Sequence, residues 1–518
     1  MQNLDTTPRD IQHCILQFIT DPRDLYNLML TCKELREAAL PFYYNTFHVY
    51  GNVALSVLAA ALVPTNPGLQ HVRHLVIKEP YVHTPIDCQR DPTLSKTDTT
   101  LTLLANLLPC GCLLTFTYDC VVSLPSSTLA ILYRRQSKLR TLRLDSIDLE
   151  PLIALRSPDS LANIATVRIC TSDPGQASSW NHVLPNLPSL RNLEVTASPC
   201  QCAEYPLTAK ASSDVFAKLL DWTWQESQYE LHLHTLQVQG FDLTGASGIL
   251  RRQVDFPGLQ VLGMQLCANS VCLVKILYET RELGRLNLRT LILVEAEKDP
   301  ESLEENPALG RLLGTFDTLE HLFVRAQGNM AYWPDFSAIA KHAASLRLLH
   351  LNCPMPKLHD PQRVEVSLRQ LDECATAYRY RDMRNLLAAL ETLPRLRTVQ
   401  ILDMLLYDLQ VGSNDRDLLK CFVRRQTRVL AEYAFNLMAN LKVFGFERFK
   451  YRRSRNNTWL PCKGQTYHRG RTIDARGREQ TTAIDASLQE LKQIEPAVEV
   501  LDMQGLEHGG LFRFGYDL

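Results

Sequence analysis

The sequence has no excess of charge of either sign. Among its 518 residues, Lys and Arg number 55 against 56 for Asp and Glu, a formal net charge of -1 at pH 7. Because its charges balance, the chain as a whole has no electrostatic field that attracts nucleic acid or an anionic membrane. Any electrostatic function therefore has to be local. Hydrophobic residues make up 45% and charged residues 21% of the chain. This composition indicates a folded protein with a sizeable core rather than a disordered polymer.

Segments that would direct the chain into or across a membrane are also lacking. The first residues, MQNLDTTPRD, contain no basic start followed by an apolar stretch. The longest apolar runs fall short of the roughly 20 residues that span a bilayer. We therefore expect a cytoplasmic or nuclear protein with no membrane partner. In such a reducing compartment the 15 cysteines are expected to be free thiols.

No recognisable catalytic or cofactor motif occurs in the sequence. There is no Walker-type phosphate loop, G-x-S-x-G elbow, H-E-x-x-H helix or paired Cys/His zinc pattern. His232 and His234 fit alternation along a strand. Two cysteine pairs are spaced more closely than the ligands of structural zinc sites, Cys110/Cys112 and Cys200/Cys202. We expect no catalytic residue, no metal and no cofactor, and we predict a binding protein.

The first fifty residues carry the signals of three short helices. Residues 7–20 begin with Thr7 as an N-cap and Pro8 at the first helical position. Asp21 and Thr31 are the expected N-caps of two further helices. The apolar residues of the first helix share one face, namely Ile11, Cys14, Ile15 and Phe18. So small a bundle has little core of its own, so we expect a partner or an attached domain to cover its apolar surface.

Over positions 7–38 these residues resemble the F-box family, in particular the divergent F-boxes of fungal proteins. The matching residues are Pro8, Ile11, Ile15-Leu16, Phe18, Asp24-Leu25, Leu28, Thr31-Cys32-Lys33 and Leu35-Arg36. The resemblance implies that the bundle binds a Skp adaptor and, through it, a cullin. It also implies that much of the adaptor-binding face is formed by Pro8, Ile11, Ile15, Leu16, Leu25, Leu28, Cys32 and Leu35. From the residues alone, a helical cap shielding the end of a repeat array remains an alternative.

Beyond residue 50 one apolar pattern recurs, as in LRTLRL from Leu139 and LRLLHL from Leu346. With substitutions allowed, units begin at Val72, Leu113, Leu139, Ile164, Leu190, Leu233, Leu259, Leu288, Leu319, Leu346, Leu396, Leu441 and Val498. Many spacings lie in or near the range of leucine-rich repeats, and amphipathic stretches separate the units. The sequence therefore predicts an α/β leucine-rich-repeat solenoid, a horseshoe, over residues 51–518 behind a three-helix F-box at residues 1–50. A Rossmann-like domain is the rival, and it is disfavoured because no Gly-rich loop follows any strand.

Period-two alternation along each unit predicts which side chains point away from the helices, onto the concave face. In the early units these outward residues are mostly polar, for example Thr141, Arg143, Asn192 and Glu194. From the seventh unit they turn apolar. We predict a target-binding surface there, formed by Ile292, Val294, Phe323, Leu348 and His350. The alternative is that a long loop or the carboxyl-terminal LFRFGYDL folds over this patch and makes it interior.

One segment is locally basic, with ten Lys/Arg residues and one acid, Asp474, between Arg448 and Arg478. Aromatic residues are interleaved with these charges, so the segment could hold an anionic peptide, a phosphorylated target or single-stranded nucleic acid. We favour a solvated loop inserted between repeats.

Taken together, the sequence predicts the non-catalytic substrate-recognition subunit of a Skp-cullin-F-box ubiquitin ligase, whose repeats bind a target protein. The alternatives are an adaptor-bound scaffold with no role in ubiquitination, and a solenoid that binds nucleic acid or another anionic ligand.

Overall fold

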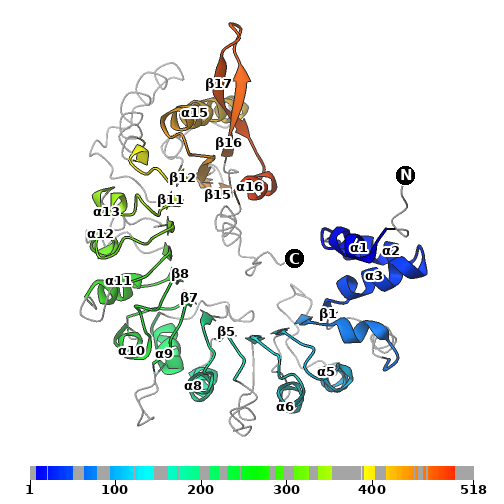
Figure 1. The fold of residues 1–518 in the computed structure, drawn as a ribbon. Coiled ribbons are helices and arrows are strands. Elements are labelled where there is room, and N and C mark those ends of the chain that lie inside the picture. Colours follow the sequence, from blue (N-terminus) through cyan, green and yellow to red (C-terminus); the bar gives the residue numbers. More distant parts are fainter. Residues whose placement is uncertain are drawn as a thin grey trace. The chain divides into compact units, whose positions relative to one another are not determined.

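The computed structural model describes residues 7–19, 21–50, 63–78, 94–120, 124, 126–144, 162–171, 174–197, 209–220, 230–244, 247–279, 286–295, 308–325, 336–352, 387, 390–402, 416–447, 450–452, 459–461 and 465–495. The chain divides into two compact units, Met1–Asp255 and Phe256–Asp517, called unit 1 and unit 2 below. Both are of mixed α/β type (Figure 1).

Unit 1 begins with the three predicted helices, which are confirmed as α1 (Arg9–Leu16), α2 (Pro22–Met29) and α3 (Lys33–Tyr43). The Asp21 side chain accepts a hydrogen bond from the Arg23 amide at 2.8 Å, as expected of the N-cap of α2.

The predicted N-caps of the other two helices are wrong. Helix α1 starts directly after Pro8, which stands at the N-cap position and offers no side-chain bond, so Thr7 is not its cap. At α3 the cap is Cys32, whose Sγ accepts from the Leu35 amide at 3.5 Å. The reason is that the Thr31 hydroxyl already donates to the carbonyl of Leu28 at the end of α2, at 2.8 Å, where helix carbonyls lack partners.

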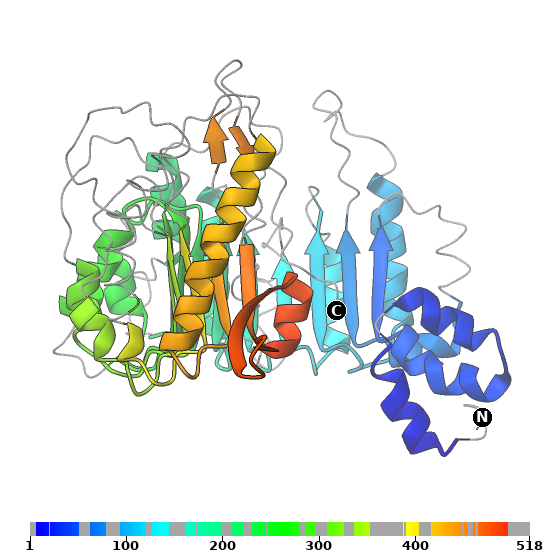
Figure 2. The same cartoon turned by 90° about the horizontal axis from the view of Figure 1, so that it is seen from above.

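A parallel sheet follows the bundle in unit 1, and its strands are neighbours in chain order (Figure 2). Its strands are β1 (Thr46–Tyr50), β2 (His74–Lys78), β3 (Thr115–Asp119), β4 (Thr141–Leu144), β5 (Thr166–Cys170), β6 (Asn192–Thr196) and β7 (Thr235–Gln239). Each predicted unit from Val72 to Leu233 contributes one strand, whereas β1 was not predicted.

Helices lie along one face of this sheet (Figure 1). They are α5 (Leu94–Leu107), α6 (Ser126–Arg135), α8 (Pro174–Val183), α9 (Ala209–Leu220) and α10 (Ser247–Gln253), with short 3-10 turns at η2 (Pro67–His71) and η4 (Leu184–Asn186). In β2 to β7 the second and fourth residues of each strand are buried and the first and third are half-buried. The parallel register aligns the buried residues in rows, one of which is Leu75, Phe116, Leu142, Val167, Leu193 and Leu236.

One backbone contact recurs at the start of successive strands. The carbonyl of Arg140 accepts from the amides of Ala165 and Thr166, at 2.8 and 3.0 Å. The same two-donor arrangement occurs at the carbonyls of Asn45, Arg73, Leu114, Ala165 and Arg191 in unit 1, and of Gln260, Arg289, Glu320, Arg347 and Arg397 in unit 2. It fixes the register of each strand on the preceding one, because a shift by one residue would turn the buried row outward.

Unit 2 continues the alternation of strand and helix. Its parallel strands are β8 (Val261–Cys267), β9 (Thr290–Glu295), β10 (His321–Arg325), β11 (Leu348–Asn352), β12 (Thr398–Leu402) and β13 (Val443–Glu447). They correspond to the predicted units from Leu259 to Leu441, and the unit at Val498 lies outside the described residues. The helices are α11 (Ser270–Glu279), α12 (Ala308–Leu313), α13 (Phe336–Ala340), α15 (Arg416–Leu437) and α16 (Leu488–Ile494).

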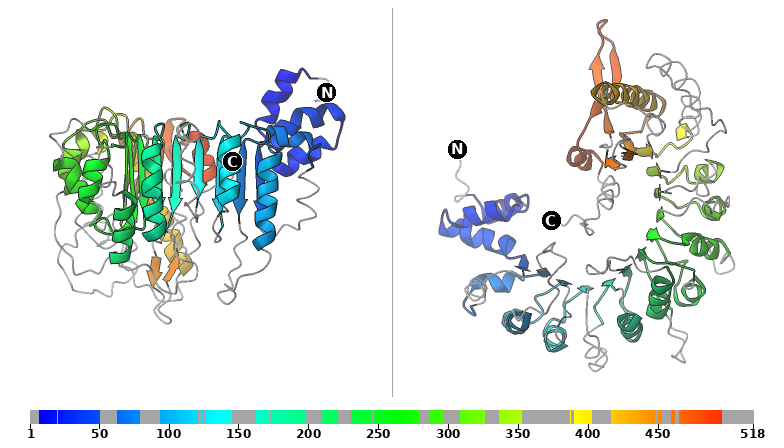
Figure 3. Two further views of the ribbon diagram at one scale, coloured as in Figure 1. Left: turned by 90° about the horizontal axis from the view of Figure 1, so that it is seen from below. Right: turned by 180° about the vertical axis from the view of Figure 1, so that it is seen from behind.

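The basic segment is not a plain loop, so that prediction is wrong for its described part. Strands β14 (Lys450–Arg452) and β15 (Trp459–Pro461) pair with each other. Strand β16 (Gln465–Ile473) pairs antiparallel with β13 and forms a hairpin with β17 (Glu479–Asp485) beside α15 (Figure 3).

Candidate functional sites

The interior of the amino-terminal bundle is small. Leu16, Leu25 and Ala39 are buried at its centre. Partly buried side chains surround them, namely Ile19, Leu28, Met29, Ala38, Phe42 and Tyr43. Burial raises the pKa of the Tyr43 hydroxyl above its usual range, so this side chain stays neutral at physiological pH.

The apolar face predicted for the first helix is exposed. Ile11, Ile15 and Phe18 expose 50%, 41% and 85% of their surface, and Cys14 between them is exposed as well. We call Ile11, Cys14, Ile15 and Phe18 the apolar stripe. The buried residues of α1 are Gln12 and Leu16. An apolar stripe left open on a bundle with so small a core is typical of a surface that binds a partner.

The eight residues predicted to bind the adaptor therefore separate into three groups. Pro8, Ile11 and Ile15 are exposed, and Leu28 and Cys32 are half-buried. Leu16, Leu25 and Leu35 are buried at 1%, 5% and 6% exposure, so they hold the helices together and do not reach the surface. Sequence reasoning missed two further exposed side chains, Tyr26 and Leu30 (48% and 68%). Their spacing of four residues on a predicted helix was the signal that could have found them.

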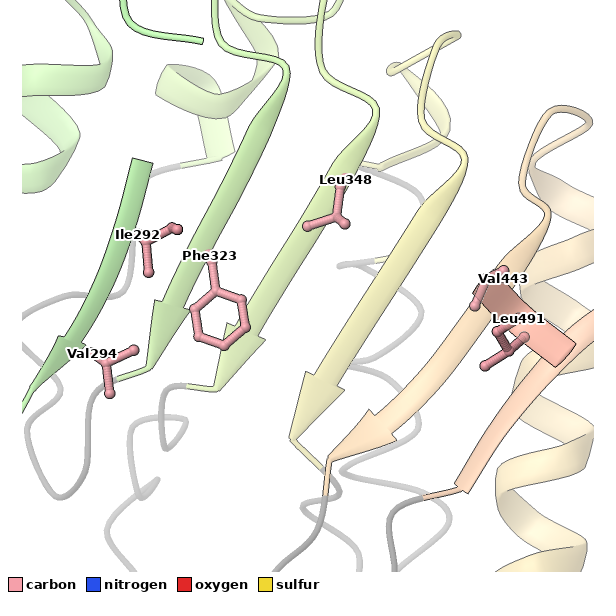
Figure 4. Close-up of a cluster of buried hydrophobic side chains, with 6 residues drawn as sticks. All are labelled: Ile292, Val294, Phe323, Leu348, Val443 and Leu491. Atoms are coloured by element: carbon pink, nitrogen blue, oxygen red, sulfur yellow. The ribbon is translucent and has the colours of Figure 1, made fainter. Parts of the chain in front are cut away.

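The prediction of an open target surface in unit 2 is wrong. Ile292, Val294, Phe323, Leu348 and His350 all have 5% exposure or less. They do share one face of the sheet, as the alternation predicted (Figure 4). Val443 and Leu491 complete the apolar cluster, and both are fully buried. The patch is therefore interior, as in the alternative that the sequence left open.

Part of its cover is helix α16, which contributes Leu491 to the cluster (Figure 4). A capping box starts this helix, because the Ser487 hydroxyl accepts from the Glu490 amide and the Glu490 carboxylate accepts from the Ser487 amide. At its end, Glu495 lies 3.7 Å from Arg397 and 3.4 Å from Lys442. The tail LFRFGYDL lies outside the described residues.

Beside this cluster, polar side chains are buried as well. The rings of Phe323 and His350 stack with centroids 3.8 Å apart and an interplanar angle of 3°. His350 Nδ1 lies 3.1 Å from Gln400 Oε1 on the next strand. Both His350 and Gln400 are buried, so this interaction stabilises the inside of unit 2.

In the described part of the basic segment, the charges have partners within unit 2. Arg471 pairs with Glu479 and Arg478 with Asp474, each at 3.0 Å. Arg469 donates to the carbonyls of Phe435 and Met438 at the end of α15, where a cation is stabilised by the helix dipole. The interleaved aromatic Tyr467 is buried and bonded to Thr427 at 2.9 Å. Arg469 and Tyr467 are therefore built into unit 2, whereas the side chains of Arg471 and Arg478 remain 76% and 66% exposed beside their carboxylate partners.

The sheet face of unit 1 opposite the helices is half-buried and polar. One row across the strands consists of Thr46, His74, Thr115, Thr141, Thr166, Asn192 and Thr235. Hydrogen bonds link some of its neighbours, such as His74 to Thr115 at 2.8 Å and Asn192 to Thr166 at 3.0 Å. Burial, and to a lesser degree the charge of Arg73, lower the pKa of His74, so it is neutral at physiological pH.

The next row of the same face carries charge. It consists of Val76, Thr117, Arg143, Arg168, Glu194 and Gln237, and we call it the arginine row. Arg168 Nε lies 2.6 Å from Glu194 Oε2, and their side chains remain 29% and 22% exposed. The sequence indicated the polar character of this face but did not single out Arg168.

No family model matches the chain, and no curated protein does either.

The histidines and cysteines noted in the sequence make structural contacts in the described residues. The exposed His232 pairs with Asp255 at 3.1 Å, and Cys112 is buried, which raises the pKa of its thiol. Cys200 and Cys202 lie outside the described residues. Within the described segments, no three His, Cys, Asp or Glu side chains are grouped as metal ligands, and no helix is long and apolar enough to cross a membrane.

Proposed function

We propose that this chain is a target receptor of a Skp-cullin-F-box ubiquitin ligase. In this proposal the amino-terminal bundle is an F-box that binds a Skp adaptor, and the strand-helix units form a degenerate leucine-rich-repeat solenoid that binds the target protein. The chain positions the target and performs no bond chemistry itself.

The observation that carries the proposal is the exposed apolar stripe on α1 and the turn that follows it. Fully burying an exposed Ile or Phe side chain contributes roughly 1.5 to 3 kcal/mol. A partner that covers the exposed parts of Ile11, Ile15 and Phe18 therefore gains binding free energy. The resemblance to F-boxes over positions 7–38 indicates the kind of partner, which is an adaptor with a complementary apolar surface.

The repeat assignment rests on two independent regularities. Strands occur at the predicted units from Val72 to Leu441, and the same two-donor carbonyl contact begins one strand after another. Units that recur in sequence and also in backbone contacts are what a repeat solenoid requires, since each repeat is stabilised by its neighbours.

The decisive experiment is capture of purified Skp adaptor by the full chain carrying Ile15→Asp and Phe18→Asp. We expect capture to be abolished without loss of thermal stability, because both side chains are exposed. Leu28, which packs against the bundle core, is unsuitable for this test since its replacement would unfold the bundle.

Leu103→Asp is the matched control, because Leu103 is a 54% exposed apolar residue on α5 of the same unit. It should leave adaptor capture unchanged. Retained capture by the Ile15/Phe18 double variant would sink the F-box assignment. When the chain is used to capture partners from a cell extract instead, recovery of the adaptor without cullin would indicate a scaffold with no role in ubiquitination.

A further inference from the structure

The residue directly before each of the strands β9 to β13 in unit 2 is charged. These residues are Arg289, Glu320, Arg347, Arg397 and Lys442. The amide of each donates a hydrogen bond to the carbonyl of the one before it, at 2.8 Å in every case. They therefore lie in a row across the amino ends of the strands, and neighbouring members of the row are roughly 5 Å apart.

Four members of this row are cations with side chains open to solvent. We call Arg289, Arg347, Arg397 and Lys442 the basic ladder. Their side chains are 55%, 48%, 47% and 44% exposed. The nearby His321 adds no charge, because burial is the main cause that lowers its pKa and its ring is neutral at physiological pH.

Glu320 lies between the first two members of the ladder. Its Oε1 is 3.5 Å from Nη1 of Arg289, and its Oε2 is 3.9 Å from Nε of Arg347. Both are ion pairs at the surface, where solvent screens the attraction and each pair contributes little. One carboxylate is thus shared by two guanidinium groups.

Glu495 has the same position between the last two members, although it comes from another element. It ends α16, and its Oε2 is 3.7 Å from Nη1 of Arg397 and 3.4 Å from Nζ of Lys442. The Glu495 side chain is 12% exposed, so the carboxylate is well enclosed there. A carboxylate carried by a separate segment therefore fits between two members of the ladder. The four cations and two carboxylates leave a formal charge of +2 on the row.

No such carboxylate is shared by the two middle members in the described part of the chain. Arg347 and Arg397 precede the paired strands β11 and β12. Each shares its carboxylate with the ladder member on its other side, through Glu320 and Glu495 respectively. Like charges on neighbouring strands destabilise a sheet. A further carboxylate between Arg347 and Arg397 would complete the alternation of charge and offset this repulsion.

We propose that Arg347 and Arg397 together bind an aspartate or glutamate side chain of an acidic segment of the target protein. Each guanidinium is a planar fork of donors that matches a carboxylate, and the chain already fills the other two spaces of the ladder with carboxylates. This inference rests on the proposed function in one respect, that the strand-helix units meet the target. It places the target site at the amino ends of β11 and β12, outside the interior apolar cluster.

The test measures fluorescence anisotropy of a labelled peptide in which glutamate and serine alternate, titrated with the full chain at low ionic strength. A peptide with glutamine in place of glutamate is the reference probe. We expect the glutamate peptide alone to bind. Arg347→Gln or Arg397→Gln should weaken its binding roughly fivefold, since each removes a charge and its hydrogen bonds at a half-exposed position. Arg425→Gln removes the same charge from an exposed position of α15 in the same unit, and it should leave binding unchanged.

Glu320→Gln separates a binding role from a merely structural one. It releases Arg347 from its ion pair, and four cations with one carboxylate leave the row a formal charge of +3. Binding of the glutamate peptide should therefore tighten by about twofold, the effect of one partly exposed charge. A ladder that only stabilises the sheet predicts a lower melting temperature for this variant and no tighter binding.

The inference is overturned if the glutamate and glutamine peptides bind alike, if Arg347→Gln behaves as Arg425→Gln does, or if Glu320→Gln does not tighten binding. It is also overturned if a labelled single-stranded oligonucleotide of the same charge binds more tightly than the glutamate peptide and depends on Arg347. Adaptor capture, measured on the same variants, reports on the proposed function separately. A chain that captures the adaptor but does not discriminate between the peptides refutes only the acidic target site.

Discussion

At the scale of single residues, Phe323 illustrates how one side chain can be outward in its strand and yet interior in its unit. It points away from the helices, but it is 2% exposed and stacks on the fully buried ring of His350. Its neighbours in the cluster, Ile292 and Val294, are equally enclosed. Phe323 is therefore a packing residue.

This burial leads to a first prediction about stability. Phe323→Ala should lower the free energy of unfolding by about 3 to 5 kcal/mol, because it removes a buried ring and leaves a cavity. Chemical denaturation monitored by circular dichroism measures the change. If the variant keeps its full stability but loses target binding, Phe323 is a surface residue that binds the target and the prediction is wrong.

His342 is buried for a different reason, because it satisfies backbone groups between repeats. Its Nδ1 accepts from the Leu319 amide at 3.3 Å, and its Nε2 lies 3.0 Å from the Leu313 carbonyl, which requires the neutral ring with the proton on Nε2. Gln136 has the same role in unit 1, because its side-chain oxygen accepts hydrogen bonds from the amides of Cys112 and Leu113. Burial is the main cause that lowers the pKa of His342 in the folded state.

A pH dependence of stability follows from that lowered pKa. Below the ordinary histidine pKa of about 6.5 the unfolded chain binds a proton that folded His342 does not, so acid favours unfolding. The stabilising contribution of neutral His342 is complete above that pH and is lost as the pH falls toward the folded-state pKa. His342→Gln, which can make both backbone bonds without titrating, should flatten the fall in melting temperature between neutral and mildly acidic pH. An identical pH profile for the variant and the parent chain would contradict this role.

At the scale of elements, α16 is a short helix that is held in place by a few contacts. Leu491 inserts into the apolar cluster, and Glu495 is flanked by Arg397 and Lys442. A helix of this length is not stable alone. Its position therefore depends on the sheet, and the exclusion of water from the cluster depends partly on the helix.

Leu491→Asp should detach α16, because a carboxylate would otherwise be buried among apolar side chains. We expect increased binding of a hydrophobic dye and faster hydrogen exchange in residues 486–494, while strands β9 to β11 stay protected. Gln493→Asp, at an exposed position of the same helix, is the control and should change neither. Unaltered dye binding by Leu491→Asp would show that α16 does not seal the cluster.

At the scale of the whole molecule, the two proposed activities map to different parts of the chain. The helical bundle ends at Tyr43, whereas Thr46–Tyr50 form β1, which pairs with β2. The carbonyl of Asn45 also accepts from the amides of Arg73 and His74. Residues 46–50, assigned to the F-box from the sequence, thus contribute to the sheet.

A truncated chain that begins at Tyr44 should therefore lose the adaptor and cullin while it retains its target. Mass spectrometry of proteins recovered with the intact and the truncated chains tests this expectation. A cut after residue 50 is a poorer design, because it removes β1 and leaves the edge of β2 open to aggregation. Simultaneous loss of every partner from the Tyr44 chain, with its sheet still folded, would contradict the division of roles.

The sequence by itself determined the first three helices and the parallel strands β2 to β13, but not β1 or the antiparallel strands of the basic segment. Helical spacing around Ile11 and Leu25 and strand alternation from Val72 to Leu441 predicted the elements, because periodicity is a property of neighbouring residues. Only the tertiary structure decided which faces are open. Whether the second face of a strand meets water depends on distant segments, as when Leu491 of α16 packs into one buried cluster with Phe323 and Val443. No alternation within a strand encodes such a contact, and for that reason only the folded chain showed that the apolar patch of unit 2 is interior.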